Sequence, residues 1–384
     1  MKTKKNESRL HVLFVLENYY PNIGGVETLF KSLAENLARN GHRVTILTTR
    51  LSLSDPPKEI QGNIAIHRYR FLNRYFFTLF AIFPVLKHAR CCDLVHTTSY
   101  NAALPAYLGA RLLGKKIVVT FHEVWASLWL TLPFMGWLPK RLHYLFEQML
   151  LRLDFDRFVG VSGSTSESLR KAGVPAERVM TIYNGINYQD FTETDAATAP
   201  KKNSIFTYTY FGRLGMSKGL DILLEAARLF RQQCPDSRLK LIVPTQPAGF
   251  LKQILGDIEK KGLAGHVSIL HHLTFGQLKM ELASSDCTVI PSYSEGFCFA
   301  AAESIALGVP VVSSGRAALK EVVSGRFIEM EDMTPGALAA ALQKARVGEW
   351  RQTPLKKFEL SDTIAAYENL YFQLSSEPLT KRQL

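Results

Sequence analysis

The chain has 384 residues, of which 47% are hydrophobic, and its formal net charge is +12. This length suits two domains, and the composition is that of a globular protein with large buried cores. No apolar run reaches the roughly 18 residues of a membrane-spanning helix, and residues 1–10 lack the apolar region of a signal peptide. The five cysteines show no CxxC spacing. This usage favours a cytoplasmic protein over a disulfide framework or a zinc site.

The basic charge is concentrated in the first half. Residues 1–190 contain 24 Lys and Arg against 14 Asp and Glu, whereas the remainder contains 22 against 20. Such an excess predicts an anionic partner, such as a lipid surface or a phosphorylated acceptor. Solubility alone is the alternative interpretation, and it stays open. We do not expect a nucleic-acid partner.

The first half alternates apolar strands with helices, which predicts a mostly parallel sheet covered on both faces. Residues 10–16 form a continuous apolar run, followed by an amphipathic helix around residues 30–38 and a strand at 44–47. Further strands are expected at 64–69, 94–96, 117–121 and 157–161, and helices at 71–90, 102–113 and 142–153. A polar loop is expected at 52–62.

Gly24 and Gly25 stand between the first strand and the first helix. The N-terminus of a helix offers unpaired N–H groups, and glycines allow an anion to approach the backbone there. The loop matches neither the GxGxxG nor the Walker pattern. An ordinary tight turn is therefore the alternative interpretation.

His122 directly follows the strand expected at 117–121. Ligands collect at the carboxyl ends of strands in such sheets, so His122 is a candidate for substrate binding. A histidine that only caps the loop is the simpler interpretation of this residue by itself.

Residues 125–151 contain three tryptophans beside Lys140 and Arg141. Aromatic and basic residues together are typical of a membrane interface. They are equally typical of a buried helix pair, which we take as the first interpretation. Asp154 and Asp156 resemble a DxD metal motif, but they immediately precede a strand, and we interpret them as loop acids.

The second half begins with a linker, judged by composition, at 191–203. A strand is expected at 205–211 and a helix at 220–231, joined by the loop that runs from Gly212 to Gly219. Arg213 and Lys218 in this loop could hold a diphosphate beside the helix N-terminus. Two solvated charges are the alternative. Strands at 239–243, 267–270 and 288–290 continue the pattern and predict a second α/β domain.

Glu295 and Glu303 lie eight positions apart in a stretch of small and apolar residues. We expect Glu295 in the loop before a helix and Glu303 about two turns inside it. Gly308 and Pro310 end the helix before a strand at 311–312. A capping carboxylate with an ion pair elsewhere is the alternative, because buried acids need partners.

Together these motifs resemble one family, the retaining GT-B glycosyltransferases of family four (glycosyl transferases group 1, the E-x7-E type). The resemblance spans about residues 10–325, and no single motif decides it. The matching motifs, in family order, are Gly24-Gly25-Val26-Glu27, Gly41-His42-Arg43-Val44, Thr120-Phe121-His122, Val161-Ser162, Asn184-Gly185-Ile186, Gly212-Arg213 with Lys218-Gly219, Glu295-Gly296-Phe297 with Glu303, and Gly308 with Pro310-Val311-Val312.

The resemblance implies an α/β fold of GT-B type, with two Rossmann-like domains facing each other across a cleft. It also implies that Arg213 and Lys218 neutralise the diphosphate and that Glu295 supports the donor sugar and its transition state. Glu303 would hold the ribose hydroxyls, and His122 would contact the sugar from the other domain. The remaining donor-binding positions implied are Gly24, Gly25, Gly212, Phe297, Cys298 and Phe299.

The function implied is transfer of a hexose-type sugar from a UDP- or GDP-sugar to a glycan or lipid-linked acceptor, with retention, as in polysaccharide biosynthesis. No metal and no cofactor are expected beyond the nucleotide-sugar substrate. The work would take place in the cytoplasm or peripherally at the inner face of the membrane. Two alternatives stay open: a nucleotide-sugar epimerase on the same fold, and a non-catalytic sugar-nucleotide-binding subunit.

The chain departs from the family pattern at five places, one of which is a region after Arg316 that is shorter than usual. Cys298 replaces the second glycine of Gly-Phe-Gly, and Asn187 stands where aspartate is usual. Residues 244–247 (Pro-Thr-Gln-Pro) and His271 replace glycine-containing positions near the expected nucleobase. The identity of the donor base is therefore in doubt.

The resemblance gives the domain limits as residues 1–190 (acceptor-binding), the linker 191–203, residues 204–360 (nucleotide-sugar-binding), and a final helix in 361–384 that crosses back to the first domain. Residues 368–373 (Glu-Asn-Leu-Tyr-Phe-Gln) match a viral-protease cleavage sequence used in expression vectors. An apolar helical stripe runs through them, so we interpret them as native, and an added cleavage site is the alternative.

Overall fold

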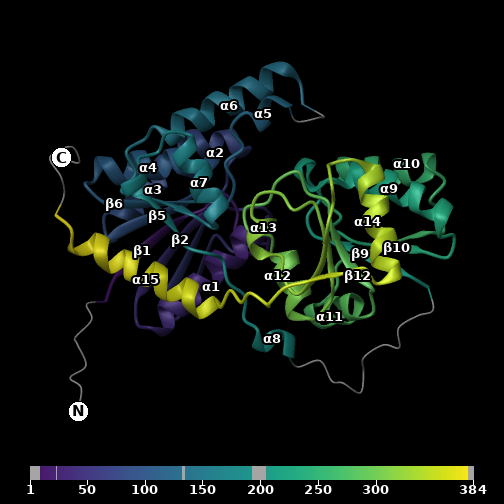
Figure 1. Ribbon diagram of the computed structural model, residues 1–384. Coiled ribbons are helices and arrows are strands. Elements are labelled where there is room, and N and C mark those ends of the chain that lie inside the picture. Colours follow the sequence, from purple (N-terminus) through teal and green to yellow (C-terminus); the bar gives the residue numbers. More distant parts are fainter. Residues whose placement is uncertain (1–8, 23, 132–134, 193–204, 379–384) are drawn as a thin grey trace, which may run out of the picture. The chain divides into compact units, whose positions relative to one another are not determined.

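The structure is a computed structural model that describes residues 9–22, 24–131, 135–192 and 205–378 (Figure 1). The chain divides into two compact units. The first contains the described residues up to Leu130, Gly136–Asn184 and the chain from Ser361. The second contains Gly185–Leu360 and, among the described residues, also Thr131 and Met135. The division follows Asn184, six positions before the limit expected at 190. Of the expected linker, residues 193–203 lie outside the described residues.

The first unit is built on an eight-stranded sheet with the order β3-β4-β2-β1-β5-β6-β7-β8. All neighbouring pairs are parallel except β3 and β4. The central strands β1, β5 and β6 are buried almost throughout because helices cover both of their faces. The strands are β1 His11–Val15, β2 Arg43–Thr49, β3 Lys58–Gln61, β4 Ile64–Tyr69, β5 Leu94–Thr98, β6 Lys116–Phe121, β7 Arg157–Gly160 and β8 Val179–Thr181.

Strand β3 corrects the polar loop expected at 52–62. Its side chains lie mostly in solvent at the edge of the sheet, so it lacks the buried apolar pattern that marks a strand in sequence. The helix expected at 71–90 is likewise two helices that meet at Ala81. The helices of this unit are α1 Gly25–Arg39, α2 Arg74–Phe80, α3 Ile82–Ala89, η1 Tyr100–Ala102, α4 Ala103–Leu112, α5 Leu128–Thr131, α6 Trp137–Leu151, α7 Gly163–Lys171, η2 Ala176–Arg178 and α15 Leu360–Ser376.

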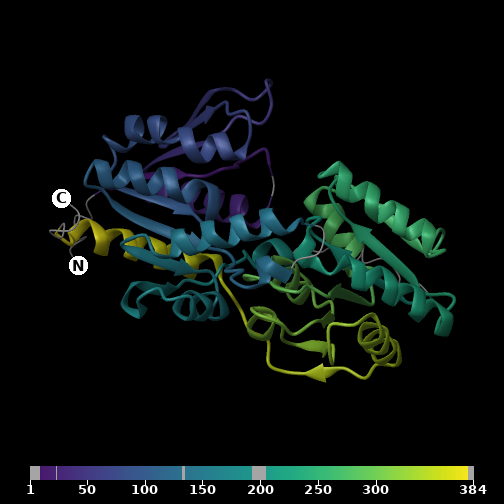
Figure 2. The same ribbon diagram turned by 90° about the horizontal axis from the view of Figure 1, so that it is seen from above.

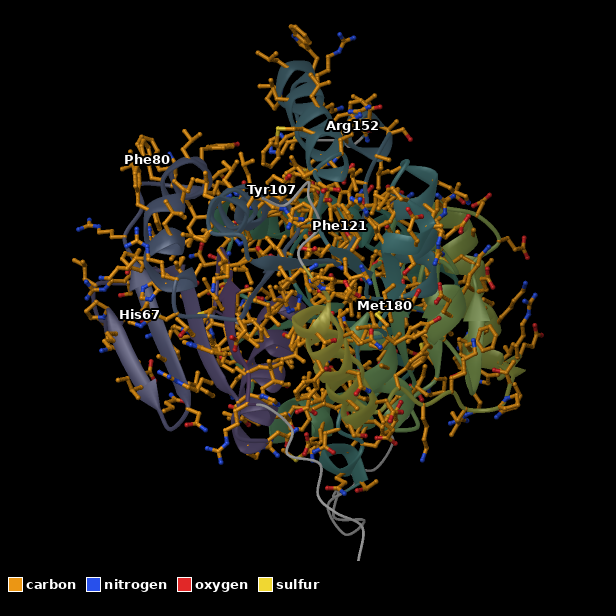
Figure 3. All side chains as sticks on the ribbon, turned by 90° about the vertical axis from the view of Figure 1, so that its left-hand side faces the viewer. His67, Phe80, Tyr107, Phe121, Arg152 and Met180 are labelled. Atoms are coloured by element: carbon orange, nitrogen blue, oxygen red, sulfur yellow. The ribbon has the colours of Figure 1, made fainter. Side chains whose placement is uncertain are left out.

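The core of the first unit lies between the sheet and its helices. Phe121 and Phe158 are buried there and face each other with ring centroids 6.0 Å apart. Figure 3 shows Phe121 inside the unit and Phe80 at its outer edge. Within the described ranges, no helix is both long and apolar enough to cross a membrane.

The last helix, α15, packs into the first unit (Figures 1 and 2). Tyr367 and Tyr371 are fully buried, and the Tyr371 hydroxyl lies 2.6 Å from His96 Nδ1. Glu368 accepts hydrogen bonds from Asn40 and from His42 Nε2 at 2.8 Å. The stretch 368–373 is therefore part of the folded core, as expected of a native helix and not of an appended cleavage site.

The second unit contains a seven-stranded sheet with the order β11-β10-β9-β12-β13-β14-β15. Only β14 and β15 pair antiparallel. The strands are β9 Thr207–Phe211, β10 Arg238–Ile242, β11 Val267–Leu270, β12 Cys287–Ile290, β13 Val311–Ser313, β14 Arg326–Glu329 and β15 Arg351–Gln352. The helices are α8 Gln189–Thr192, η3 Met216–Lys218, α9 Leu220–Gln233, α10 Ala248–Lys260, α11 Phe275–Ala283, α12 Phe299–Ala306, α13 Leu319–Val322 and α14 Pro335–Val347. Helix α8 belongs to this unit because its buried Phe191 packs on Phe275.

The order of the strands creates a switch point between β9 and β12. From β9 the chain runs outward through β10 and β11 and then returns to place β12 on the other side of β9. The loops that follow β9 and β12 therefore leave from the carboxyl ends of adjacent parallel strands. Ligands of open α/β sheets bind at this kind of position.

Candidate functional site

The loop from Gly212 to Gly219 links β9 to α9 and needs both of its terminal glycines. Gly212 has φ of 142° and Gly219 has φ of 66°, which side chains disfavour. A Cβ at Gly219 would lie 2.0 Å from the carbonyl oxygen of Pro291. The Tyr293 N–H donates to the Ser217 carbonyl at 2.8 Å. The loops after β9 and β12 are therefore joined backbone to backbone.

Lys218 and Glu295 meet between these two loops. Lys218 Nζ donates to both carboxylate oxygens of Glu295 at 2.9 Å, and Ser292 Oγ donates to Oε1 at 2.7 Å. The Glu295 side chain is only 8% exposed. A buried carboxylate with these partners is held in one orientation. Glu295 thus forms an ion pair, as its alternative interpretation expected. The partner is Lys218, the cation predicted to lie in the same site.

Arg213 is exposed, and no described residue pairs with its guanidinium. Its backbone is fixed because the Tyr210 hydroxyl donates to the Arg213 carbonyl at 2.9 Å. Arg316 is a second exposed cation, in the loop after β13, between positive-φ residues Gly315 and Ala317. Both can offer a planar fork of donors to a phosphate.

Cys298 immediately precedes α12 in a conformation that glycine would favour. Its φ is 76° and its ψ is 79°. Burial raises the pKa of its thiol well above the usual value, so the group stays neutral. Phe297, the residue before Cys298, is buried. Its ring packs edge-on against Phe299 and Phe358, with 5.3 Å between ring centroids in each case.

Glu303 lies just over one turn inside α12, which begins at Phe299. The expectation of two turns was wrong because Glu303 follows Phe299, where the helix begins as the apolar spacing indicated, by only four positions. Burial raises the pKa of this carboxyl to about 7. Within the part of the chain that the structure describes, no side chain hydrogen-bonds to it.

The residues expected near a nucleobase come together at the carboxyl ends of β10 and β11. His271 Nδ1 lies 2.7 Å from the Val243 carbonyl oxygen, and Thr245 Oγ1 lies 3.3 Å from His272 Nε2. Histidines thus occupy the end of β11 where glycine was expected.

The remaining predicted residues belong to the first unit. Gly24 caps α1 with an extended φ of −164°, and Gly25 is the first residue of that helix. His122 directly follows β6 and is partly buried. The pKa of the buried His96 is lowered to about 3, mainly by burial and also by the charge of His122.

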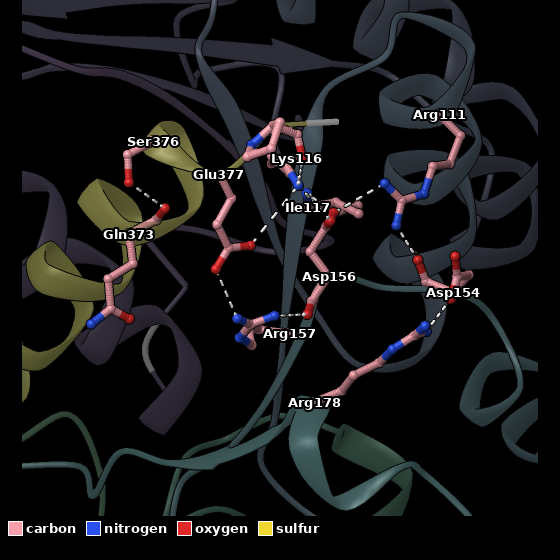
Figure 4. A network of polar contacts seen from close by, with 11 residues as sticks. Arg111, Lys116, Ile117, Asp154, Asp156, Arg157, Arg178, Gln373, Ser376 and Glu377 are labelled. Atoms are coloured by element: carbon pink, nitrogen blue, oxygen red, sulfur yellow. Dashed lines mark hydrogen bonds and ion pairs between the residues drawn. The ribbon is translucent and has the colours of Figure 1, made fainter. Parts of the chain in front are cut away.

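The DxD-like acids are held in ion pairs. Asp156 pairs with Arg111 at 3.0 Å and with Lys116 at 3.6 Å, and Asp154 bonds to Arg178 (Figure 4). Their interpretation as loop acids agrees with this arrangement. Within the described ranges, no group of three His, Cys, Asp or Glu residues is placed to hold a metal ion.

Two family models match consecutive parts of the chain. Residues 23–190 match "Glycosyltransferase Family 4", and residues 191–346 match "Glycosyl transferases group 1". The chain belongs to the GT-B glycosyltransferases of this family. The GT-B glycosyltransferase family and the fold class of two α/β domains predicted from sequence are confirmed, whereas the E-x7-E type and retention stay predictions.

Relatives of this glycosyltransferase include an Arabidopsis thaliana protein named as one subunit of phosphatidylinositol N-acetylglucosaminyltransferase. It is 23% identical over 348 residues, which cover 88% of this chain and 74% of the relative. D-inositol 3-phosphate glycosyltransferase of Pseudarthrobacter chlorophenolicus is 24% identical over 315 residues, covering 76% of this chain and 74% of the relative.

Solved structures with the same fold include sucrose-phosphate synthase from Thermosynechococcus elongatus. Its TM-score is 0.80 at 20% identity, and the match covers 96% of this chain and 99% of that one. Anabaena HepE in complex with UDP and glucose has a TM-score of 0.73 at 18% identity, covering 96% and 100%.

The structure therefore brings Lys218, Glu295 and Cys298 together with Arg213 in the loops of the second unit. Sequence reasoning missed Ser292, which fixes Glu295, and Tyr210, which fixes Arg213. It also missed Arg316 as a candidate. The signal for Arg316 was present, because Ser-Ser-Gly-Arg directly follows a strand.

Proposed function

We propose that this glycosyltransferase transfers a hexose-type sugar from a UDP- or GDP-sugar to a glycan or lipid-linked acceptor, with retention and without a metal ion. The observation that carries the proposal is the pairing of Lys218 with Glu295 beside the unpaired Arg213 at the switch point of the second sheet. A diphosphate bound there meets Arg213, Lys218 and the N-terminus of α9.

In this mechanism the protein works by position and charge. Arg213 and Lys218 stabilise the negative charge that develops on the leaving diphosphate. Glu295 faces the sugar and supports the positive charge that develops at its anomeric carbon. The departing phosphate oxygen takes the proton of the acceptor hydroxyl while the acceptor attacks the same face of the sugar. No covalent bond to the enzyme forms.

Glu303 and the first unit complete the donor site in this proposal. The Glu303 carboxyl accepts hydrogen bonds from the ribose hydroxyls, and its raised pKa falls when such donors replace the apolar surroundings. Gly25 allows the phosphate to approach the α1 backbone, and His122 contacts the sugar. Backbone N–H groups of 297–299 face the sugar and diphosphate.

The acceptor class follows from the names of the relatives and the charge of the first half. Both relatives are named for an inositol-phosphate acceptor. Residues 1–190 carry the excess of cations that suits a phosphorylated or membrane-borne acceptor. Phosphorylated inositols and their lipids are thus the first acceptors to test, at the inner face of a membrane.

The deciding experiment uses Arg213→Ala, with Arg351→Ala as the matched control at the exposed edge strand β15. Donors are first ranked by thermal shift across UDP- and GDP-sugars, where a ligand at 100 times its Kd stabilises by about 2.7 kcal/mol. Turnover with EDTA should match turnover without it, and the product anomer is read by NMR. Arg213→Ala should abolish turnover, and Arg351→Ala should not. Full activity of Arg213→Ala would overturn the assignment, as would an inverted anomer.

The same material separates the two alternatives. An epimerase converts the nucleotide sugar when no acceptor is present, so product analysis of the donor alone identifies it. A non-catalytic subunit binds the donor in calorimetry but neither hydrolyses nor transfers it with any acceptor.

A further inference from the structure

Large apolar side chains are exposed in two segments of the first unit. Eleven of the 24 exposed large apolar side chains among the described residues lie on α2, α3 and α6 or directly beside them. Scattered single exposures are ordinary on a soluble protein, whereas concentration on neighbouring elements marks an interaction site. We refer to the exposed side of α2, α3 and α6 as the apolar surface.

Helix α6 turns an apolar stripe away from the core. Leu138, Leu142, Leu145 and Met149 recur at helical spacing and are exposed, Leu145 by 60%. Trp137 at the start of the helix is 71% exposed. The opposite face carries the buried Glu147, Leu150 and Leu151. The buried helix pair expected for this stretch is therefore wrong: one face of α6 is buried, and its other apolar face is not.

Helices α2 and α3 repeat this arrangement. Their inner side chains, Phe77, Ala81 and Val85, are completely buried. The outward-facing side chains of these two helices are aromatic or leucine, and Phe83 is 67% exposed. The exposed set is Leu72, Tyr75, Phe76, Leu79, Phe80 and Phe83.

The two segments lie on the same side of the unit. Both α2 and α6 pack against η1. Figure 1 shows α2 and α6 along the upper side of this unit. The apolar surface thus consists of two helical segments on one side of the unit.

The exposed charges on α2, α3 and α6 have one sign. Helices α2 and α3 contain no acidic residue, and the single acid of α6, Glu147, is completely buried. Its carboxylate accepts hydrogen bonds from the N–H groups of Trp125 and Ala126 and from the Tyr100 hydroxyl. Exposed cations flank the apolar side chains instead: Lys87, Arg90, Arg141 and Arg152, together with Arg74, whose charge is paired with Glu17.

We propose that the apolar surface docks the enzyme onto a bilayer that contains anionic lipids, with its aromatic and leucine side chains at headgroup depth. Apolar side chains beside cations are the chemistry that such an interface selects. A second copy fits less well, because pairing this surface with itself would bring like charges together. The proposal does not depend on the sugar donor or on the reaction.

The test measures binding of the full chain to vesicles of phosphatidylcholine, with and without 30% phosphatidylglycerol, by flotation. Two variants remove the apolar side chains: Leu142→Ser with Leu145→Ser on α6, and Leu79→Ser with Phe83→Ser on α2 and α3. Val347→Ser with Leu355→Ser removes similarly exposed side chains (58% and 62%) from the second unit as the matched control. Circular dichroism and thermal unfolding check that each variant is folded.

We expect binding to vesicles with phosphatidylglycerol, weakened at high salt, and reduced tenfold or more by each surface variant but not by the control. Arg141→Glu should reduce it about fivefold or more. Trp137→Phe should bind normally yet lose the blue shift of tryptophan emission on binding. Absence of binding to the anionic vesicles, or equal binding by all variants, would overturn the proposal. So would a dimer in solution that the same surface substitutions dissociate, because the surface would then belong to a second copy.

Discussion

Lys218 Nζ lies 2.9 Å from both carboxylate oxygens of Glu295, 77 positions further along the chain. Neither side chain is more than 18% exposed. The pair therefore fixes the geometry between two loops, and it holds a cation and an anion next to each other in a poorly solvated place. Its energetics can be separated from its proposed catalytic role by measurements on the unliganded protein.

Removing the cation should destabilise the fold strongly. Lys218→Met leaves the Glu295 carboxylate buried without its charge partner, which costs about 3 kcal/mol of unfolding free energy. Urea unfolding measures the loss, and adding Glu295→Gln should recover part of it. The matched control is Lys344→Met, because Lys344 pairs with Glu331 in solvent and should contribute less than about 1 kcal/mol. Equal losses for both variants would contradict the buried pairing.

Glu303 should make the stability of the free enzyme fall between pH 4.5 and pH 7. Its pKa is raised from 4.5 to about 7 by burial, so the folded state holds this proton more tightly than the unfolded chain. The stabilisation is complete below pH 4.5 and is lost as pH rises through about 7, which amounts to about 3 kcal/mol. Glu303→Gln removes this dependence. In urea unfolding without ligand, the variant should therefore match the wild type at pH 5 but exceed its stability at pH 8.

Substitutions at Cys298 should reverse the usual order of alanine and glycine. The left-handed backbone at this position disfavours any side chain by about 1 kcal/mol. Cys298→Gly should therefore be more stable than Cys298→Ala, although glycine ordinarily costs stability through the unfolded state. Thermal unfolding of the pair decides the question, and a more stable alanine variant would show that the backbone there is relaxed.

The native chain should resist the viral protease that recognises residues 368–373. Proteases cleave extended segments, whereas this stretch is helical with Leu370 and Tyr371 buried. Mass spectrometry should find the chain intact after incubation with the protease. Tyr371→Phe removes the partner of the buried His96 Nδ1 and costs about 1–3 kcal/mol, so this variant should be cut faster. Rapid cleavage of the wild type would mean that α15 is open in solution.

Much of the fold was predictable because buried parallel strands read as apolar runs. The buried strands at His11–Val15 and Lys116–Phe121 lie within one residue of where the sequence placed them. Strand β3 was missed because its side chains face solvent at an edge. Helix α6 was misinterpreted because an apolar stripe has the same spacing whether it meets a core or remains exposed.

The sequence predicted which residues belong to the candidate site, but not how they are arranged in space. Residue types and spacing singled out Arg213, Lys218 and Glu295, but a separation of 77 positions carries no information about a contact. The positive φ at Cys298 was also not predictable, because a sequence indicates such a backbone conformation only where it has a glycine. The switch point between β9 and β12 explains why distant loops meet, and it depends on strand order, which local patterns do not encode.

The placement of α15 has a consequence for how the molecule is made. The first unit buries Tyr367, Tyr371 and Leu374 beside strands that are synthesised some 250 residues earlier. On the ribosome the second unit can close before the first unit has its full set of side chains. The half that begins the chain is therefore the last to be completed, and a ribosome that stops near residue 360 releases a chain whose defect lies in the half made first.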